Sequence, residues 1–141
     1  MSRSKLVSIV DDEPEITELF CDALCRIEGC RVFKFTDPAL ALEHFKINVK
    51  DYALVVSDLR MPIINGMQLL KTVKDLNPFA RTILMTAFAT DDEVFQEYIK
   101  RKIINALLQK PIRVHNFINE VQTELDFYQT QEVLIPKARL D

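Results

Sequence analysis

Five side chains that could bind a metal or take part in phosphoryl transfer each follow a short apolar run. Asp11 and Asp12 follow the first run, and Asp58 follows the third. Thr86 and Lys110 follow the fourth and the fifth. Each residue alone has an ordinary explanation, such as a helix cap, a turn hydroxyl or a solvated loop charge. Their shared position is not explained in that way, so the five residues are a candidate functional site.

The residue types in this group indicate one kind of chemistry. Three carboxylates close together repel one another and need a counterion to stay ionised. Oxygen ligands suit a hard cation such as Mg²⁺, which typically takes one or two carboxylates together with waters and phosphate oxygens. A carboxylate is also a competent nucleophile toward phosphorus and forms an aspartyl phosphate. A metal, the Lys110 ammonium and the Thr86 hydroxyl would then stabilise the phosphoryl oxygens.

Short apolar runs alternate with longer amphipathic stretches along the whole chain. The runs predict strands over residues 6–10, 30–35, 52–56, 81–85 and 106–108. The stretches between and after them predict five helices, the fourth over about 90–102 and the last carrying its apolar face to Tyr128. We expect carboxylate caps followed by proline to start the first helix at 12–14 and the second at 37–38.

This alternation predicts an α/β fold of the (βα)5 type, a doubly wound five-stranded parallel sheet. Its crossovers are right-handed and its helices cover both faces. Ligands in such sheets bind beyond the carboxyl ends of the strands. The five candidate residues all follow strands, so we expect them to meet at that edge.

Composition excludes several classes of function. The chain has 141 residues, 48% hydrophobic and 28% charged, which is typical of one globular domain. Only two glycines occur, Gly29 and Gly66, so glycine-rich dinucleotide and phosphate loops are excluded. The net charge of −3 provides no positive field for nucleic acid. We therefore expect no direct nucleic-acid binding by this chain.

The cysteines and the apolar runs bear on localisation. Three cysteines, at positions 21, 25 and 30, lack the spacing of a disulfide or metal framework. They are expected to be reduced, small core residues. No apolar run approaches the ~18 residues of a membrane span, and the first five residues do not resemble a signal peptide. We expect a cytoplasmic protein without membrane contact.

Four motifs in order carry a resemblance to a known family. They span residues 9–14 (IVDDEP), 57–62 (SDLRMP) with Gly66, 85–87 (MTA) and 110–111 (KP). Together they resemble the receiver domain of two-component response regulators, including chemotaxis regulators, over about residues 5–128. The resemblance implies a flavodoxin-like sheet with strand order 2-1-3-4-5. It also implies a phosphorelay function, in which a histidine kinase or phosphotransfer protein phosphorylates the domain, which then controls an output partner.

The same resemblance implies a role for each candidate residue. Asp58 is the phosphoacceptor, and Thr86 and Lys110 bind the phosphoryl oxygens. The ion is expected to be Mg²⁺, with Mn²⁺ as a substitute. Its ligands are Asp11, either directly or through water, Asp12, Asp58 and the backbone carbonyl of Arg60. Such a protein is a signalling phosphoacceptor rather than an enzyme, because it assists only its own phosphorylation and dephosphorylation.

The chain departs from the family pattern near its fifth strand. Leu107 stands three positions before Lys110, where receivers usually carry an aromatic residue that rotates inward on phosphorylation. Ile103 and Ile104 replace a usual Gly-Ala pair. We expect output through the face of the fourth helix, fifth strand and fifth helix to use different packing. A homodimer through this face is a further expectation. Arg60 and Phe88, which flank the phosphoryl site in the family, are expected to hinder hydrolytic water.

Several alternatives remain beside this interpretation. A phosphatase of the haloacid dehalogenase group would need a carboxylate two residues after Asp58, where Arg60 stands. A degenerate receiver that acts as an interaction module without phosphorylation is the other alternative. Residues 129–141 fit either an extension of the last helix or a linker to an effector domain outside this chain. The output partner is therefore a separate protein or such a domain.

Overall fold

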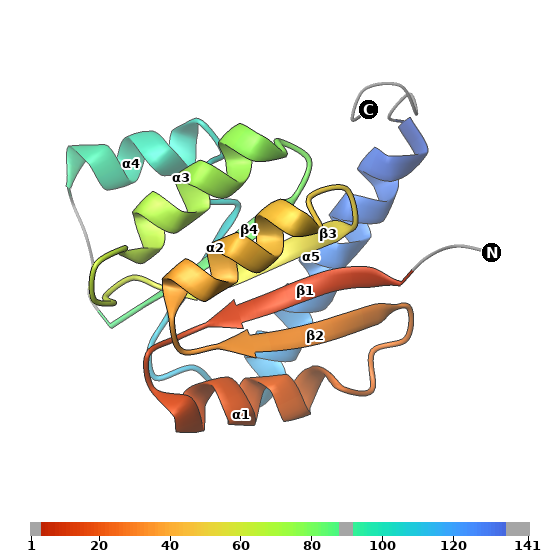
Figure 1. The fold of residues 1–141 in the computed structure, drawn as a ribbon, viewed down its shortest axis with the longest axis horizontal. Coiled ribbons are helices and arrows are strands. Elements are labelled where there is room, and N and C mark those ends of the chain that lie inside the picture. Colours follow the sequence, from red (N-terminus) through yellow and green to blue (C-terminus); the bar gives the residue numbers. More distant parts are fainter. Residues whose placement is uncertain (1–3, 88–91, 135–141) are drawn as a thin grey trace.

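The computed structural model describes residues 4–87 and 92–134, without the side chains of 132–134. Strands and helices alternate along this part of the chain (Figure 1). The strands are β1 (Lys5–Val10), β2 (Cys30–Phe35), β3 (Tyr52–Asp58), β4 (Arg81–Thr86) and β5 (Ala106–Gln109). The helices are α1 (Pro14–Leu24), α2 (Pro38–Ile47), α3 (Gly66–Leu76), α4 (Glu93–Lys100) and α5 (Val114–Leu134).

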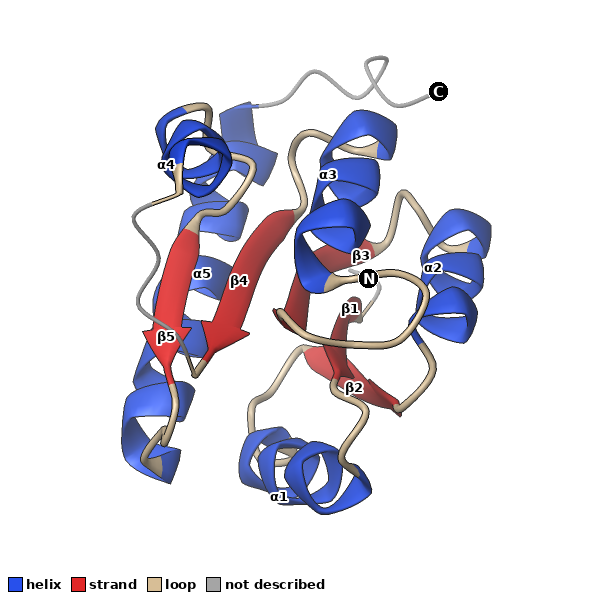
Figure 2. Ribbon diagram, turned by 90° about the vertical axis from the view of Figure 1, so that its left-hand side faces the viewer, coloured by secondary structure: helices blue, strands red, loops and turns tan. Residues whose placement is uncertain are grey.

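The strands form one parallel sheet in the order β2-β1-β3-β4-β5. Both the predicted (βα)5 architecture and the strand order are confirmed. Figure 2 shows the sheet between its helices. Every residue of β3, the central strand, is buried, as expected for a parallel strand covered on both faces.

Two apolar clusters hold the helices on opposite faces of the sheet. One cluster packs α2, α3 and α4 against the strands, and the other packs α1 and α5. In the second cluster the rings of Phe20 and Phe117 stack with centroids 4.0 Å apart. This packing fixes the strand ends, and with them the site residues, relative to one another.

Helix starts follow the predictions only in part. Asp37 caps α2 by accepting a 2.9 Å hydrogen bond from the Ala39 N–H. The predicted carboxylate cap of α1 is wrong, because the N-cap residue Glu13 makes no side-chain capping bond. Instead, the backbone N–H of Glu13 donates to Asp11 Oδ1 at 3.0 Å. The carboxylate bound at this helix start is therefore that of Asp11, a candidate site residue, and not one within residues 12–14.

Several positions predicted to lie on apolar helix faces or in the core are also exposed, such as Leu19 of α1 at 47%. Val94, on the apolar face predicted for the fourth helix, is 55% exposed, whereas its neighbour Phe95 is buried. The described part of this helix is shorter than the predicted 90–102 and begins at Glu93. Cys25 is exposed rather than in the core, and it stands at the C-cap, where α1 ends.

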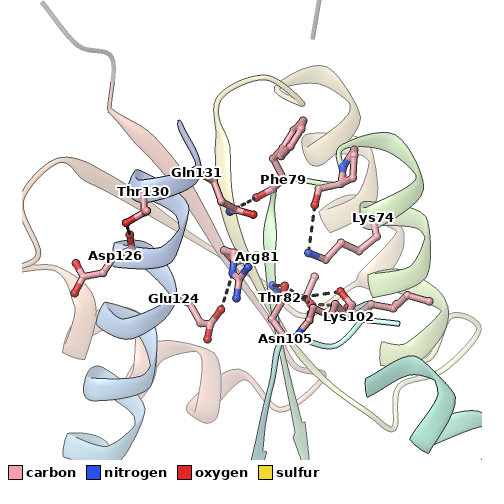
Figure 3. Close-up of polar contacts among 12 residues, drawn as sticks. Lys74, Phe79, Arg81, Thr82, Lys102, Asn105, Glu124, Asp126, Thr130 and Gln131 are labelled. Carbon is pink, nitrogen blue, oxygen red and sulfur yellow. Dashed lines mark hydrogen bonds and ion pairs between the residues drawn. The ribbon is translucent and has the colours of Figure 1, made fainter. Parts of the chain in front are cut away.

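Helix α5 continues beyond residue 128 and packs against the start of β4. Gln131 Nε2 donates to the Phe79 carbonyl at 3.3 Å (Figure 3). Next to this contact, Arg81 Nε donates to Glu124 Oε1 at 2.8 Å, and both side chains are largely buried. The helical interpretation of the tail therefore holds to Leu134, and residues 135–141 lie outside the described part. No helix among the described residues is long and apolar enough to cross a membrane.

Candidate functional site

The parallel sheet brings the predicted site residues to one edge. Asp58 and Thr86 are the last residues of β3 and β4, Asp11 directly follows β1, and Lys110 directly follows β5. In the register of β3 and β4, Asp58 pairs with Met85, one residue before Thr86. The backbone N–H of Lys110 donates to the Thr86 carbonyl at 2.7 Å, which joins the last two strand ends.

Lys110 is the charged centre of this edge. Its Nζ lies 2.9 Å from Asp11 Oδ2 and 3.1 Å from Asp58 Oδ1. Asp11 is fully buried and Asp58 is nearly so, at 7% exposed. Glu13 Oε1 lies 3.9 Å from the same Nζ. One ammonium group thus faces three carboxylates within the described residues, which leaves the site with excess negative charge.

The pKa values of Asp58 and Lys110 are shifted by burial and by the neighbouring charges. Burial raises the pKa of Asp58, and the charge of Asp11 raises it further, while the Lys110 hydrogen bond opposes both effects. For Lys110, burial is the largest single effect and lowers its pKa. The hydrogen bonds and charges of Asp11 and Asp58 together outweigh burial, so the pKa of Lys110 is raised overall. The charges of Asp11, Asp58 and Lys110 thus act directly on one another.

The carboxylates are arranged to hold a cation. Asp11, Asp12 and Asp58 each offer an oxygen, and these oxygens lie within 4.8 Å of one another. Asp12 is exposed, so the group is open to solvent on one side. An all-oxygen donor set with surplus negative charge fits a hard divalent cation that keeps some of its waters. The three acidic residues predicted as metal ligands are thus brought together.

A cavity of about 290 Å³ opens over these residues. Asp12, Asp58, Arg60, Thr86 and Lys110 are among the residues that line it. A cavity of this kind can admit a phosphoryl group, with a carboxylate nucleophile, a hydroxyl donor and an ammonium group on its walls. Apart from Asp11, which contacts Lys110 but is not among the lining residues, every predicted site residue therefore lines the same space. Phe88, predicted to flank it, lies outside the described residues.

Gly66 packs directly against the backbone of Asp58. A Cβ at position 66 would overlap the backbone oxygen of Asp58 and lie 2.8 Å from Leu84 Cδ1. The N–H of Gly66 donates to the Leu59 carbonyl at 2.8 Å, and Asn65 and Gln68 form a capping box at the start of α3. Helix α3 can approach the end of β3 this closely only because residue 66 has no side chain. The motif identifies Gly66, whereas this steric role appears only in the structure.

Glu13 is a site residue that the sequence interpretation did not include. It stands directly after the two predicted metal ligands and was expected to act only at the start of the helix. In the structure it lines the cavity over Asp58 and lies near Lys110. The adjacent acidic triplet is the signal in the sequence, but only the geometry of the turn into α1 places the third carboxylate.

The residues near β5 that depart from the family pattern differ in how exposed they are. Leu107 is 41% exposed, so position 107 carries an exposed aliphatic side chain in place of a ring. Ile103 and Ile104 are both buried, at 5% and 2% exposed, and fill the turn before β5. The face between α4 and α5 therefore presents a modest aliphatic side chain to solvent.

Comparison with known proteins gives one consistent result. The family model described as "Response regulator receiver domain" matches residues 7–122. The DNA-binding transcriptional regulator NtrC of Escherichia coli is 29% identical over 127 residues, 90% of this chain but 26% of NtrC. The chain thus spans about a quarter of the length of these relatives. The polar-differentiation response regulator DivK of Brucella anthropi is 28% identical, covering 86% of this chain and 96% of DivK.

Solved structures agree with the sequence matches. An uncharacterised protein from Neptuniibacter caesariensis superposes with a TM-score of 0.81 at 28% identity, covering 100% of this chain and 99% of the other. A CheY-like receiver domain protein from Methanospirillum hungatei superposes with a TM-score of 0.77 at 23% identity, covering 92% and 99%. The second comparison supports the fold.

Proposed function

The chain belongs to the response regulator receiver domain family, and from this premise we propose that Asp58 accepts a phosphoryl group from a histidine kinase or phosphotransfer protein. The observation that carries the proposal is the bridge of Lys110 Nζ between Asp11 and Asp58, at 2.9 and 3.1 Å, beside Thr86 at one sheet edge. Mg²⁺ is the proposed cofactor and Mn²⁺ a substitute. The protein acts as a signalling phosphoacceptor and catalyses no reaction on another substrate.

Each side chain has a distinct part in the proposed transfer. An oxygen of Asp58 attacks phosphorus and forms the acyl phosphate, while the phosphorus–nitrogen bond to the donor histidine breaks and its electron pair returns to the imidazole. The Lys110 ammonium moves from its carboxylate partners toward the new phosphoryl oxygens, and the Thr86 hydroxyl donates to one of them. Asp11, Asp12, Asp58 and the backbone carbonyl of Arg60 would hold the cation, which neutralises charge on the transferred group.

We propose that phosphorylation controls an output partner. The pull of the new oxygens on Thr86 and Lys110 would shift the ends of β4 and β5, which carry α4 and α5. The exposed Leu107 cannot rotate inward as a ring would, so the partner adds differential affinity of its own. The partner is a separate protein or an effector domain of a longer chain. The face of α4, β5 and α5 is the proposed homodimer interface, and the cytoplasm is the proposed location.

A non-phosphorylated interaction module is the less favoured alternative. A receiver that had lost its chemistry would be free to lose the acidic ligands, the hydroxyl or the lysine. Here the carboxylate oxygens lie within 4.8 Å of one another, and Lys110 contacts two of the three groups. This complete arrangement supports a phosphorylated receiver.

Intact-mass spectrometry tests the proposal with acetyl phosphate as the donor. The wild type should gain one phosphoryl group with Mg²⁺ and none when EDTA removes the metal. Asp58→Asn should gain none under either condition. Calorimetric titration should show weaker Mg²⁺ binding by Asp12→Ala than by the control Glu15→Gln. A phosphoryl adduct that persists in Asp58→Asn would refute the assignment of the acceptor.

A further inference from the structure

Glu13 stands at the boundary between two cavities. One is the cavity of about 290 Å³ over Asp58, and the other is an adjoining cavity of about 360 Å³. The two share Glu13, Ala87 and Lys110 as lining residues. The second cavity is otherwise mostly apolar, since Ile16, Phe20 and Ile112 form part of its wall. Among the described residues that line both cavities, Lys110 is therefore the one cationic side chain beside Glu13.

The charge of Glu13 is only partly balanced by Lys110. Glu13 Oε1 lies 3.9 Å from Lys110 Nζ, whereas Asp11 and Asp58 have carboxylate oxygens at 2.9 and 3.1 Å from the same atom. The Glu13 side chain is also 56% exposed, so it projects into the solvent that a donor must cross. Its backbone is held in place because its N–H donates to Asp11 Oδ1 at 3.0 Å. The Glu13 carboxylate thus adds negative charge at the rim of the cavity.

We propose that Glu13 sets the charge preference for the phosphodonor of Asp58, disfavouring donors that carry more negative charge. This inference rests on the proposed function and concerns its specificity. A small acyl phosphate must bring its full anionic charge past Glu13 to reach Asp58. The resulting repulsion slows phosphorylation by free metabolite-like donors, and a protein donor can offset it with contacts elsewhere.

Two small donors of different charge separate this effect from the chemistry. Acetyl phosphate is a doubly charged anion near neutral pH, and phosphoramidate is singly charged. With either donor an Asp58 oxygen forms the bond to phosphorus. The bond that breaks is phosphorus–oxygen in acetyl phosphate, which releases acetate, and phosphorus–nitrogen in phosphoramidate, which releases ammonia. Comparing variant with wild type for each donor cancels the difference in leaving group.

The experiment measures the rate of phosphorylation of the full chain by intact mass at saturating Mg²⁺. Removing one unit of charge several ångströms away in a water-rich cavity changes the rate about twofold per unit of donor charge. Glu13→Gln should therefore react about fourfold faster with acetyl phosphate and about twofold faster with phosphoramidate. Both gains should shrink at high ionic strength. Glu13→Asp, which keeps the charge, should retain the donor preference of the wild type.

Glu15→Gln is the matched control. Glu15 is exposed in the same first turn of α1 and is not among the residues lining either cavity in the described part of the chain. An unchanged ratio of the two donors in Glu13→Gln, or the same change in Glu15→Gln, would overturn the inference while the proposed function stands. Failure of both donors to label the wild type would instead refute the proposed function.

Discussion

Replacing Gly66 by alanine should damage the fold and the site together. Residue 66 begins α3, and its Cα faces the end of β3. An added methyl group would overlap the backbone oxygen of Asp58 and approach Leu84 Cδ1 to 2.8 Å. A carbonyl in a buried central strand cannot rotate away as a flexible side chain can. Helix α3 and the Asp58 backbone must therefore move apart.

The size of this effect follows from the contact. Overpacking a well-packed interior costs about 1–3 kcal/mol, and a clash with backbone belongs at the upper end. Alanine also reduces the entropy of the unfolded chain, which offsets somewhat under 1 kcal/mol. We expect Gly66→Ala to lower the free energy of unfolding by about 2–3 kcal/mol. In a domain of this size, that loss lowers the melting temperature by roughly 6–12 °C.

Gly29→Ala is the matched control, because it tests a backbone cost without a clash. Gly29 has a φ of +82° and no atom within 4 Å of an added Cβ. Its replacement should cost about 1 kcal/mol from the left-handed conformation alone. Urea unfolding gives both free energies, and labelling by acetyl phosphate with Mg²⁺ gives the site effect. Only Gly66→Ala should slow labelling, because only its methyl group displaces Asp58.

Two results would contradict this reasoning. If Gly66→Ala lost no more stability than Gly29→Ala, the close approach of α3 to Asp58 would not exist as described. If Gly66→Ala were destabilised but were labelled at the wild-type rate, the position of the Asp58 backbone would not matter for phosphorylation.

Three further predictions concern stability. Burial lowers the pKa of Lys74 to about 8, with Arg81 adding to the shift and Glu124 opposing it, so its charged form is disfavoured in the folded state. Folding stability from this group is gained as pH rises from about 8 toward its ordinary pKa of 10.5, and is lost below that window. At pH 7 the free energy of unfolding of Lys74→Met, measured with urea, should thus be about 2 kcal/mol higher than that of the wild type. This gain should shrink as the pH is raised to 10.5. The control Lys71→Met should show only a small difference that does not change with pH. Arg81→Met leaves Glu124, whose side chain is 4% exposed, without its ion-pair partner (Figure 3). The free energy of unfolding in the same assay should fall by about 3 kcal/mol. A fall of less than about 1 kcal/mol would argue against a buried ion pair. Ile63 has a φ of 71° and is 97% exposed, so its backbone is held in a left-handed conformation while its side chain is not buried. Ile63→Gly should therefore raise the free energy of unfolding by about 1 kcal/mol in thermal unfolding. A lower melting temperature would show that the side chain is needed.

Much of the fold could be predicted because each strand is short, apolar and followed by a helix signal. The parallel sheet followed from that alternation, and the position of Asp58 and Lys110 at its carboxyl edge followed from the sheet. The strand order came from the resemblance to receivers, because periodicity alone does not say which strands are neighbours. The cap of α1 was mispredicted at residues 12–14: Glu13 is the N-cap residue but its side chain makes no capping bond, and its own N–H donates to Asp11, which lies outside the predicted segment.

The finer features of the site could not be predicted from residue types. Glu13 lines the cavity over Asp58 because of the conformation of the turn between β1 and α1. The pattern of apolar residues does not predict the conformation of that turn. The contact of Gly66 with the Asp58 carbonyl depends on how closely α3 packs on β3. The left-handed Ile63 also departs from its residue type, since branched side chains disfavour positive φ. Each of these features is set by packing between elements.

Chemical trapping of the phosphorylated residue tests the central claim most directly. The wild type, treated with acetyl phosphate and Mg²⁺, would be reduced with borohydride, which converts an aspartyl phosphate to homoserine. Peptide mass spectrometry should then find homoserine at position 58 and aspartate at positions 11 and 12, and no conversion when EDTA replaces the metal. Homoserine at position 11 or 12, or an unreduced Asp58 in a protein that carries the phosphoryl group, would contradict the account.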